Sequence, residues 1–453
     1  MKKYDVAIIG AGISGIMAAY RLIQRDKNLK IALIDQGNLL KNRKCPLLSH
    51  EVSHCINCNP CSIMNGFAGA GAFSDGKFII STEYGGHLQE IIGDKLALQY
   101  MYEADKILAK YYGTQQEYSP NNILVDLCST NNLHLKRGNV KHFGTENNLL
   151  IMQSMLNDIS SNCTFLAHSP VTDVDPSERI IYINHEKIIK ANHIIFAVGR
   201  SGNSFLSAWA KRNNISVHNN KIDIGIRVEL NNHTWEKISS IAYDPKISYI
   251  TQKYNDETRM FCFNDGGHVV IENTFGLKTV NGHAYSDKKL KSKNCNFALL
   301  SSIQLAEPFN DPTTYIKNIV SCSNIISNNS VIIQCFGDLV NGKRSTINSI
   351  SASSVTPTLK AYPGDLSLCL PKRQLDNIIE TIYQLEKIAP GTANDDTLLY
   401  GIEAKYYSSI PEMDNFKLKG FDYIYACGDG CGATRSLAQA AANGLYVADT
   451  IPL

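Results

Sequence analysis

The sequence predicts an α/β fold, in which a Rossmann-type dinucleotide-binding domain carries an inserted, mainly antiparallel α+β domain. Three observations predict this fold. A short apolar strand at residues 4–9 runs into a glycine turn and a helix, and further apolar strands ending in glycine lie at 193–199 and 423–428. Residues 221 to about 370 instead alternate apolar and polar positions between polar turns, which is typical of an antiparallel sheet.

The composition describes an ordinary globular protein of two or three domains. The chain has 453 residues, of which 44% are hydrophobic and 19% charged, with a formal net charge of +2. Because basic and acidic residues are nearly equal in number, the charge gives no argument for a nucleic-acid partner. No apolar run reaches the roughly 18–20 residues that cross a bilayer, and residues 6–9 are too few for a signal peptide. We therefore expect a cytoplasmic protein with a small-molecule substrate and no membrane partner.

The first 35 residues form a predicted βαβ unit. Gly10, Gly12 and Gly15 follow the first strand and open a helix at about residue 16, and Asp35 closes the second strand. In a GxGxxG turn the glycines permit the tight turn, the approach of a pyrophosphate and close helix packing, while the helix N-terminus attracts the phosphates. An acid at the end of the second strand binds the adenosine ribose.

Later elements follow the same reasoning. Helical spacing predicts helices at residues 95–112, 145–160, 371–388 and 434–450. The change in the pattern of apolar and polar residues along the chain predicts two domains. These are a discontinuous nucleotide-binding domain, residues 1–220 and 390–453, and an inserted substrate domain, residues 221–389.

The chain resembles the two-dinucleotide-binding-domain flavoproteins of the glutathione reductase and p-hydroxybenzoate hydroxylase type. More closely, it is similar to a family of FAD-dependent dehydrogenases without a settled substrate. The resemblance is carried by residues 66–77 (GFAGAGAFSDGK), 141–145 (KHFGT), 223–229 (DIGIRVE), 296–299 (NFAL), 399–405 (LYGIEAK) and 428–444 (GDGCGATRSLAQAAANG). It implies an FAD-dependent oxidoreductase, in which an aspartate after the last strand binds the ribityl chain and the next helix faces the flavin.

Taken together, the turns and the resemblance predict a set of cofactor-binding residues. Arg43 is included because it follows the second strand closely enough to reach a phosphate, although a solvated basic loop explains it equally well. The set comprises Gly10, Gly12, Ser14, Gly15, Asp35, Arg43, Gly69, Gly71, Val171, Ala197, Gly199, Gly428, Asp429 and Thr434.

Hydride transfer to flavin N5 requires a positioned donor and often a base for the accompanying proton. We therefore expect catalytic side chains among the polar residues of the stretches that line the ring, where cations would orient a small anionic substrate. A structural ion pair is the competing interpretation for each of them. The candidates are Asp75, Lys77, Arg227, Glu403, Lys405 and Arg435.

A four-cysteine set, Cys45, Cys55, Cys58 and Cys61, stands apart from the other cysteines of the chain. Its C-x9-C-x2-C-x2-C spacing suits an iron–sulfur cluster or zinc, because both prefer thiolate ligands. Reduced structural thiols, or a dithiol that exchanges with the flavin, are the alternatives. Cys431, beside the last glycine turn, is either a reactive thiol near the flavin or a small buried side chain.

The same segment contains an HExxH pattern between His50 and His54. A metalloprotease needs both histidines on one helical face with a third ligand. The context argues against that function, because the segment is short and lies between a proline and the cysteines inside a flavin-binding domain. We expect these histidines to be loop residues or spare ligands.

Three classes of function remain open. The first is an FAD-dependent dehydrogenase or reductase acting on a small anionic molecule. The second is a flavin monooxygenase, against which the residues 430–433 (GCGA) count because they lack the usual proline. The third is an electron-transfer flavoprotein that works with a Cys-ligated cluster and a redox protein partner. No second GxGxxG follows a strand, so the use of NAD(P)H as electron donor is an open question.

Overall fold

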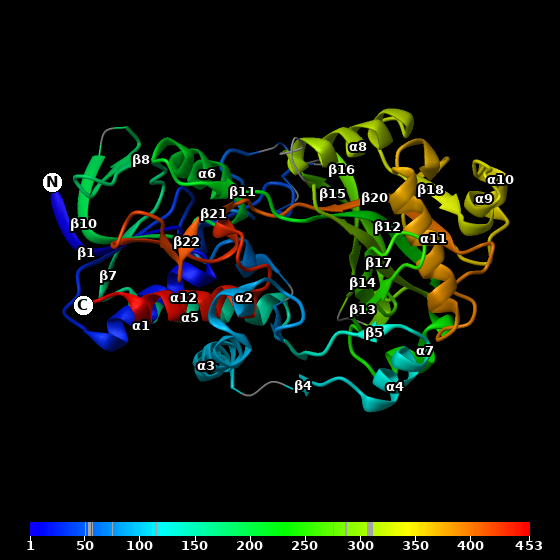
Figure 1. Cartoon of the computed structure of the whole chain (residues 1–453), viewed down its shortest axis with the longest axis horizontal. Coiled ribbons are helices and arrows are strands. Elements are labelled where there is room, and N and C mark those ends of the chain that lie inside the picture. Colours follow the sequence, from blue (N-terminus) through cyan, green and yellow to red (C-terminus); the bar gives the residue numbers. More distant parts are fainter. Residues whose placement is uncertain are drawn as a thin grey trace. The chain divides into compact units, whose positions relative to one another are not determined.

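Figure 1 shows the computed structural model, which describes residues 1–49, 51–52, 56, 58–74, 76–113, 116–185, 187–274, 276–285, 288–305 and 311–453. The chain divides into two compact units. The first contains residues 1–117, 138–220 and 407–453, and the second contains residues 118–137 and 221–406. Within the described residues, we find no helix with the length and hydropathy needed to span a bilayer.

The first unit is built on a parallel sheet. β1 (Lys2–Ile9) pairs in parallel with β10 (Lys187–Phe196) on one side and with β2 (Ile31–Ile34) on the other. β10 pairs in parallel with β24 (Ile424–Ala426), and β2 pairs in parallel with β7 (Cys163–Leu166). Every residue of β2 and β24 is buried, as expected for strands covered on both faces. The predicted Rossmann-type sheet is confirmed, and the carboxyl ends of these strands meet along one edge.

The first and last helices of the chain lie side by side, blue and red in Figure 1. α1 (Ile13–Arg25) follows β1, and α12 (Leu437–Thr450) ends the chain. Their backbones approach closely, because a Cβ on Gly444 would lie 2.1 Å from the carbonyl oxygen of Ser14. Glycine at this position therefore allows both helices to cover the same sheet.

The expected helix at residues 434–450 begins three residues later, at the start of α12. Thr434 pairs with Gly86 in an isolated antiparallel bridge, and the amide of Arg435 donates to the carbonyl of Gly85. These backbone bonds hold the segment before α12 extended. It therefore forms a loop, whose Ser436 caps the helix by accepting a hydrogen bond from the amide of Gln439.

β4 (Glu117–Tyr118) lies at the chain boundary between the units. The first unit also contains η1 (Leu40–Asn42), η2 (Ala70–Phe73), β3 (Lys77–Ile80), α2 (Leu88–Ile92), α3 (Asp94–Tyr112), β6 (Asn139–His142), α5 (Thr145–Ile159), β8 (Val171–Asp175), β9 (Ile180–Ile183), η3 (Arg200–Gly202), α6 (Asn203–Arg212), β11 (Val217–His218), β21 (Ile410–Pro411), β22 (Met413–Asp414), β23 (Lys417–Leu418) and η7 (Asp429–Cys431). Four of these elements, β8, β9, β22 and β23, extend the same sheet through antiparallel pairing.

The second unit is built on an antiparallel sheet, as the sequence predicts. β12 (Ile222–Asn231) lies between β17 (Asn294–Ile303) and β20 (Leu398–Lys405), and the full order is β19–β18–β20–β12–β17–β14–β13–β5. One face of β12 is apolar and packs in the core with α8 (Pro312–Ile326) and α11 (Lys372–Glu386). The other face carries charged residues that are also buried. Because β20 belongs to this sheet, the second unit extends beyond the expected boundary at residue 389.

The second unit also contains α4 (Asn122–Thr130), β5 (His134–Leu135), η4 (Asn232–Thr234), α7 (Glu236–Ser239), β13 (Ile247–Ile250), β14 (Glu257–Asn264), β15 (His268–Thr274), β16 (Leu277–His283), η5 (Lys288–Leu290), β18 (Ile332–Cys335), α9 (Phe336–Val340), α10 (Ile347–Ser351), β19 (Tyr362–Pro363) and η6 (Leu366–Leu368).

Candidate functional site

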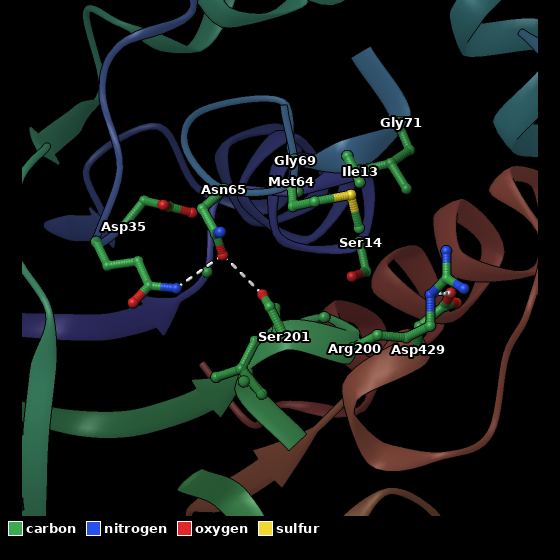
Figure 2. Close-up of a pocket in the computed structure, with 18 of the residues that line it drawn as sticks. Ile13, Ser14, Asp35, Met64, Asn65, Gly69, Gly71, Arg200, Ser201 and Asp429 are labelled. Atoms are coloured by element: carbon green, nitrogen blue, oxygen red, sulfur yellow. Dashed lines mark hydrogen bonds and ion pairs between the residues drawn. The ribbon is translucent and has the colours of Figure 1, made fainter. Parts of the chain in front are cut away.

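A cavity of about 520 Å³ opens in the first unit at the carboxyl ends of β1, β2, β10 and β24 (Figure 2). This edge is where parallel α/β sheets bind their ligands. Most of the predicted cofactor-binding residues line the cavity, and so does one predicted catalytic residue. They are Gly10, Gly12, Ser14, Asp35, Gly69, Gly71, Val171, Ala197, Gly199, Asp429 and Arg435.

The glycine turn between β1 and α1 has the geometry that its sequence predicts. A Cβ on Gly10 would lie 2.1 Å from the carbonyl oxygen of Ala197, so only glycine allows β1 to approach β10 here. Gly15 does not line the cavity, and a Cβ on it would lie 2.1 Å from the carbonyl oxygen of Gly10. Gly12 is the N-cap of α1 and no side chain caps the helix, so its first amides are available to an anion.

Asp35 and Gly199 form two further parts of the wall. Asp35 Oδ2 accepts a hydrogen bond from the amide of Ala11 at 3.0 Å, and Oδ1 accepts from the amide of Gly37 at 2.9 Å. These bonds fix the carboxylate beside the glycine turn. Gly199 has a φ of +62°, and a Cβ there would meet nothing within 4 Å. Within the described part of the chain, no side chain therefore covers the backbone at Gly199, after β10, and no neighbouring atom fills the space where a Cβ would lie.

Arg43 corrects one prediction, because it does not line the cavity. Its guanidinium is buried and donates to the carbonyl oxygens of Phe67 (2.7 Å), Gly69 (2.8 Å), Ser62 (2.9 Å) and Ile63 (2.8 Å). Burial lowers the pKa of Arg43 to about 10, so the side chain stays charged at neutral pH. With four of its five N–H donors engaged, Arg43 holds the glycine-rich loop and does not reach out to a phosphate.

The loop before α12 supplies the charged end of the cavity. Thr434, which does not line the cavity, donates from Oγ1 to Asp429 Oδ1 at 2.7 Å and so orients that carboxylate. Burial raises the pKa of Asp429, although Arg200 lies 3.7 Å from Oδ2 and opposes this effect. Arg435 stacks on the ring of Tyr407 at 3.4 Å and donates to Asn220 Oδ1 at 2.7 Å.

Gly428, the remaining member of the predicted set, supports this loop from behind the cavity. Its φ is +74°, its amide donates to Asn443 Oδ1 at 2.7 Å, and a Cβ would lie 2.4 Å from Ser14 Oγ. The neighbouring Cys431 is fully buried, and burial raises the pKa of its thiol to about 12. The structure therefore favours a small packed side chain over a reactive thiol.

Several lining residues were missed by the sequence analysis. Arg200 lies directly after Gly199, so its position behind a glycine-ended strand was a usable signal. Gln36, Asn65 and Ser201 also line the cavity, and Figure 2 shows Asn65 hydrogen-bonded to Ser201. Asn65 carries no motif of its own, and only the folded chain brings it to this wall.

Three predicted catalytic residues lie in the second unit as a charged cluster. Arg227 Nε donates to Glu403 Oε2 at 2.8 Å, and Lys405 Nζ lies 3.1 Å from Glu403 Oε1. The Arg227 guanidinium also donates to Asn296 Oδ1 at 2.8 Å. The side chains of Arg227 and Glu403 are 0% exposed, against 21% for Lys405. The expected substrate contact is therefore corrected for Arg227 and Glu403, because this geometry is that of a structural pair.

The described part of the structure places neither of the last two catalytic candidates, Lys77 and Asp75, at the cavity. Lys77 lies on β3, half-buried, and is not among the residues that line the cavity. Asp75 lies outside the described residues, as do His50 and His54 of the HExxH pattern.

The four-cysteine set is only partly described. Cys45, Cys58 and Cys61 are half-buried free thiols, whereas Cys55 lies outside the described residues. In the described parts of the chain, no three His, Cys, Asp or Glu side chains gather closely enough to hold a metal ion. Because Cys55 lies outside the described residues, zinc or an iron–sulfur cluster at the four-cysteine set stays a prediction.

The cavity suits an extended anionic dinucleotide. It offers bare glycine backbone at Gly12 and Gly199, where a Cβ would project into open space or reach only a Gly69 carbon at 3.9 Å. It also offers an uncapped helix N-terminus, a carboxylate at Asp35 and the cation of Arg200. These are the groups that accommodate a diphosphate and a ribose, so FAD fits the residues present.

Comparisons with known proteins agree with this picture. Residues 4–222 match the family of pyridine nucleotide-disulphide oxidoreductases, and residues 221–406 match the family described as FAD-dependent protein, C-terminal domain-like. An uncharacterised protein of Clostridium beijerinckii is 24% identical over 472 residues, which cover 99% of this chain and 81% of the relative.

The similar solved structures include an oxidase and a dehydrogenase. Glycine oxidase from Bacillus cereus is 11% identical, with a TM-score of 0.38 over 98% of this chain and 94% of its own. L-proline dehydrogenase from P. horikoshii is 12% identical, with a TM-score of 0.39 over 99% of this chain and 94% of its own.

Proposed function

We propose that the first unit of this chain, which belongs to the FAD-dependent oxidoreductases, holds FAD along the cavity. The enzyme then passes a hydride between a small anionic substrate and the flavin. The observation that carries the proposal is the convergence of separate turns on one cavity. They follow β1, β2, β10 and β24, and each comes from a different part of the chain.

Each part of the cofactor has a matching group in the wall. Asp35 would accept hydrogen bonds from the adenosine ribose. The first turn of α1 and the cation of Arg200 would neutralise the diphosphate, and Asp429 would accept from the ribityl hydroxyls. Gly69 and Gly71 line the cavity and would let the backbone approach the flavin ring, and a Cβ on them would lie within 3 Å of Gly12 and Leu437, respectively.

FAD, when bound, supplies an isoalloxazine ring that takes up or releases a hydride at N5. The protein's own contribution is to position the substrate and to exclude water. Arg435 is held in the wall by stacking on Tyr407 and by its hydrogen bond to Asn220. A guanidinium fixed in this way binds a carboxylate with two parallel hydrogen bonds, which orients the substrate and favours an anionic one.

The experiment is anaerobic flavin bleaching. Purified protein should carry a yellow chromophore that is released on denaturation as FAD, and its absorbance should fall when the right donor is added. NADH, NADPH and a panel of small carboxylates would be compared with uncharged analogues. A colourless protein that fails to bind added FAD would refute the proposed cofactor site.

Arg435→Met tests the substrate class. It should raise the KM for a carboxylate donor with a smaller effect on kcat, because a ground-state contact is lost. Arg212→Met is the matched control, since Arg212 is exposed, pairs with Asp173, and neither residue lines the cavity. An unchanged KM in the Arg435 variant would refute an anion-binding role for this residue.

A further inference from the structure

A hydrogen-bonded bridge joins two walls of the cavity in the first unit. Asn65 Oδ1 accepts from Gln36 Nε2 at 2.7 Å and from Ser201 Oγ at 2.7 Å (Figure 2). Gln36 follows β2 and Ser201 follows β10, whereas Asn65 belongs to the loop between η1 and η2. All three residues line the cavity, and both hydrogen bonds are solvent-exposed, so the bridge lies at the rim.

The amide of Asn65 is held in one orientation. Its Nδ2 donates to the carbonyl of Cys61 at 3.3 Å, and its backbone amide donates to the same carbonyl at 2.9 Å. Only the oxygen of the side chain can accept from Gln36 and from Ser201, so this assignment satisfies every partner. Asn65 therefore accepts both hydrogen bonds of the bridge in a single orientation of its side-chain amide.

The backbone on both sides of Asn65 is anchored. Arg43 binds the carbonyls of Ser62 and Ile63 before it and those of two loop residues after it, Phe67 and Gly69. The chain also passes very close to the β2 turn, because a Cβ on Gly37 would lie 2.6 Å from the amide nitrogen of Gly66. Asn65 thus sits between two fixed points, and its side chain can release Gln36 and Ser201 without unfolding the loop.

We propose that Asn65 is a positioning residue that straps the adenosine end of the cofactor cavity and sets the rate at which FAD enters and leaves. The inference rests on the proposed placement of FAD, with its ribose at Asp35 beside Gln36. A dinucleotide lying between the β2 and β10 turns cannot pass the rim until both hydrogen bonds to Asn65 are broken.

The test is the rate of FAD release, measured on the FAD-loaded protein by flavin fluorescence in a stopped-flow instrument. Asn65→Ala should raise the FAD dissociation rate by about 5- to 50-fold, since two exposed hydrogen bonds are lost. Asn42→Ala is the matched control, because Asn42 is exposed on η1, outside the cavity lining. Its dissociation rate should equal that of the unmodified protein.

A double-mutant cycle separates the strap from general loop support. Ser201→Ala removes one donor from the opposite wall, and it provides the test even if the Asn65 variant fails to fold. If the bridge acts as a strap, combining Asn65→Ala with Ser201→Ala should add nothing to the dissociation rate of Asn65→Ala. Full additivity, or an unchanged dissociation rate in both single variants, would overturn the strap. Failure of the unmodified protein to bind FAD would instead overturn the proposed function.

Discussion

Replacement of Arg43 by lysine tests whether this residue supports the glycine-rich loop or binds a phosphate. Arg43 donates four hydrogen bonds to carbonyl oxygens of residues 62–69, and its guanidinium lies 4.7 Å from the centre of the Phe73 ring. The planar guanidinium reaches carbonyls on two sides of the loop at once. A lysine ammonium concentrates its donors on one atom and cannot span them.

The size of the effect follows from the hydrogen bonds that are lost. A hydrogen bond from a charged donor contributes about 1.5–3 kcal/mol, and we expect Arg43→Lys to lose two of the four. Partial hydration of the released carbonyls reduces the sum, so we expect a loss of about 3 kcal/mol. For a domain of 150–250 residues this lowers Tm by about 6–12 °C.

The assay is thermal unfolding of the apoprotein, followed by FAD titration. Arg212→Lys, at an exposed ion pair, is the control and should leave Tm unchanged. The two roles give opposite results. Loop support lowers the Tm of the apoprotein, whereas a phosphate contact would leave that Tm unchanged and weaken only FAD binding. An unaltered Tm would therefore refute the reasoning from the structure.

Further predictions concern the cavity, the buried cluster and the cysteines. Gly12→Ala should leave the apoprotein Tm within about 2 °C, because φ is −75°, but should weaken FAD binding in a titration by about tenfold through a lost amide–phosphate contact. Burial raises the pKa of Asp429, so its contribution to apoprotein stability is present below about pH 4 and lost as pH rises through the folded pKa. Asp429→Asn should therefore make the Tm of the apoprotein depend less on pH on the acid side, and should weaken FAD binding. A dependence of Tm on pH that matches that of the unmodified protein would exclude the raised pKa. Arg227→Met leaves Glu403 buried without its main partner, and should cost about 3–5 kcal/mol in denaturant unfolding, which Glu403→Gln in the same chain should partly restore. Anaerobically purified protein should contain stoichiometric zinc, or iron with sulfide, if the four-cysteine set binds metal, and their absence would end that interpretation.

Much of the first unit could be predicted from the sequence, because its signals are local. An apolar strand followed at once by Gly10, Gly12 and Gly15 encodes a turn that few other residues can adopt, and Asp35 follows at the expected distance. The strand that ends at Gly199 carries the same kind of signal. These residues all line or support the cavity in the folded chain.

Other features depended on partners far apart in the chain. The spacing of Arg43 from the second strand was compatible with a phosphate, but its donors are engaged by a loop about twenty residues away. Arg227 and Glu403 were predicted to be catalytic because they lie in stretches expected to line the flavin ring. In the structure they lie on neighbouring buried strands, 176 positions apart in the sequence, and pair with each other. Asn65 belongs to no sequence motif that would have predicted its place in the cavity wall.

The sequence by itself therefore determined the parallel sheet, the glycine turns and the expectation of a dinucleotide, because backbone conformation and hydrophobic periodicity are set within a few residues. Only the tertiary structure decided which charged and polar side chains face the cavity, which neutralise each other and which bridge its walls. A hydrogen bond or an ion pair depends on two groups meeting in space at about 3 Å, and the separation of those groups along the chain carries no information about that distance.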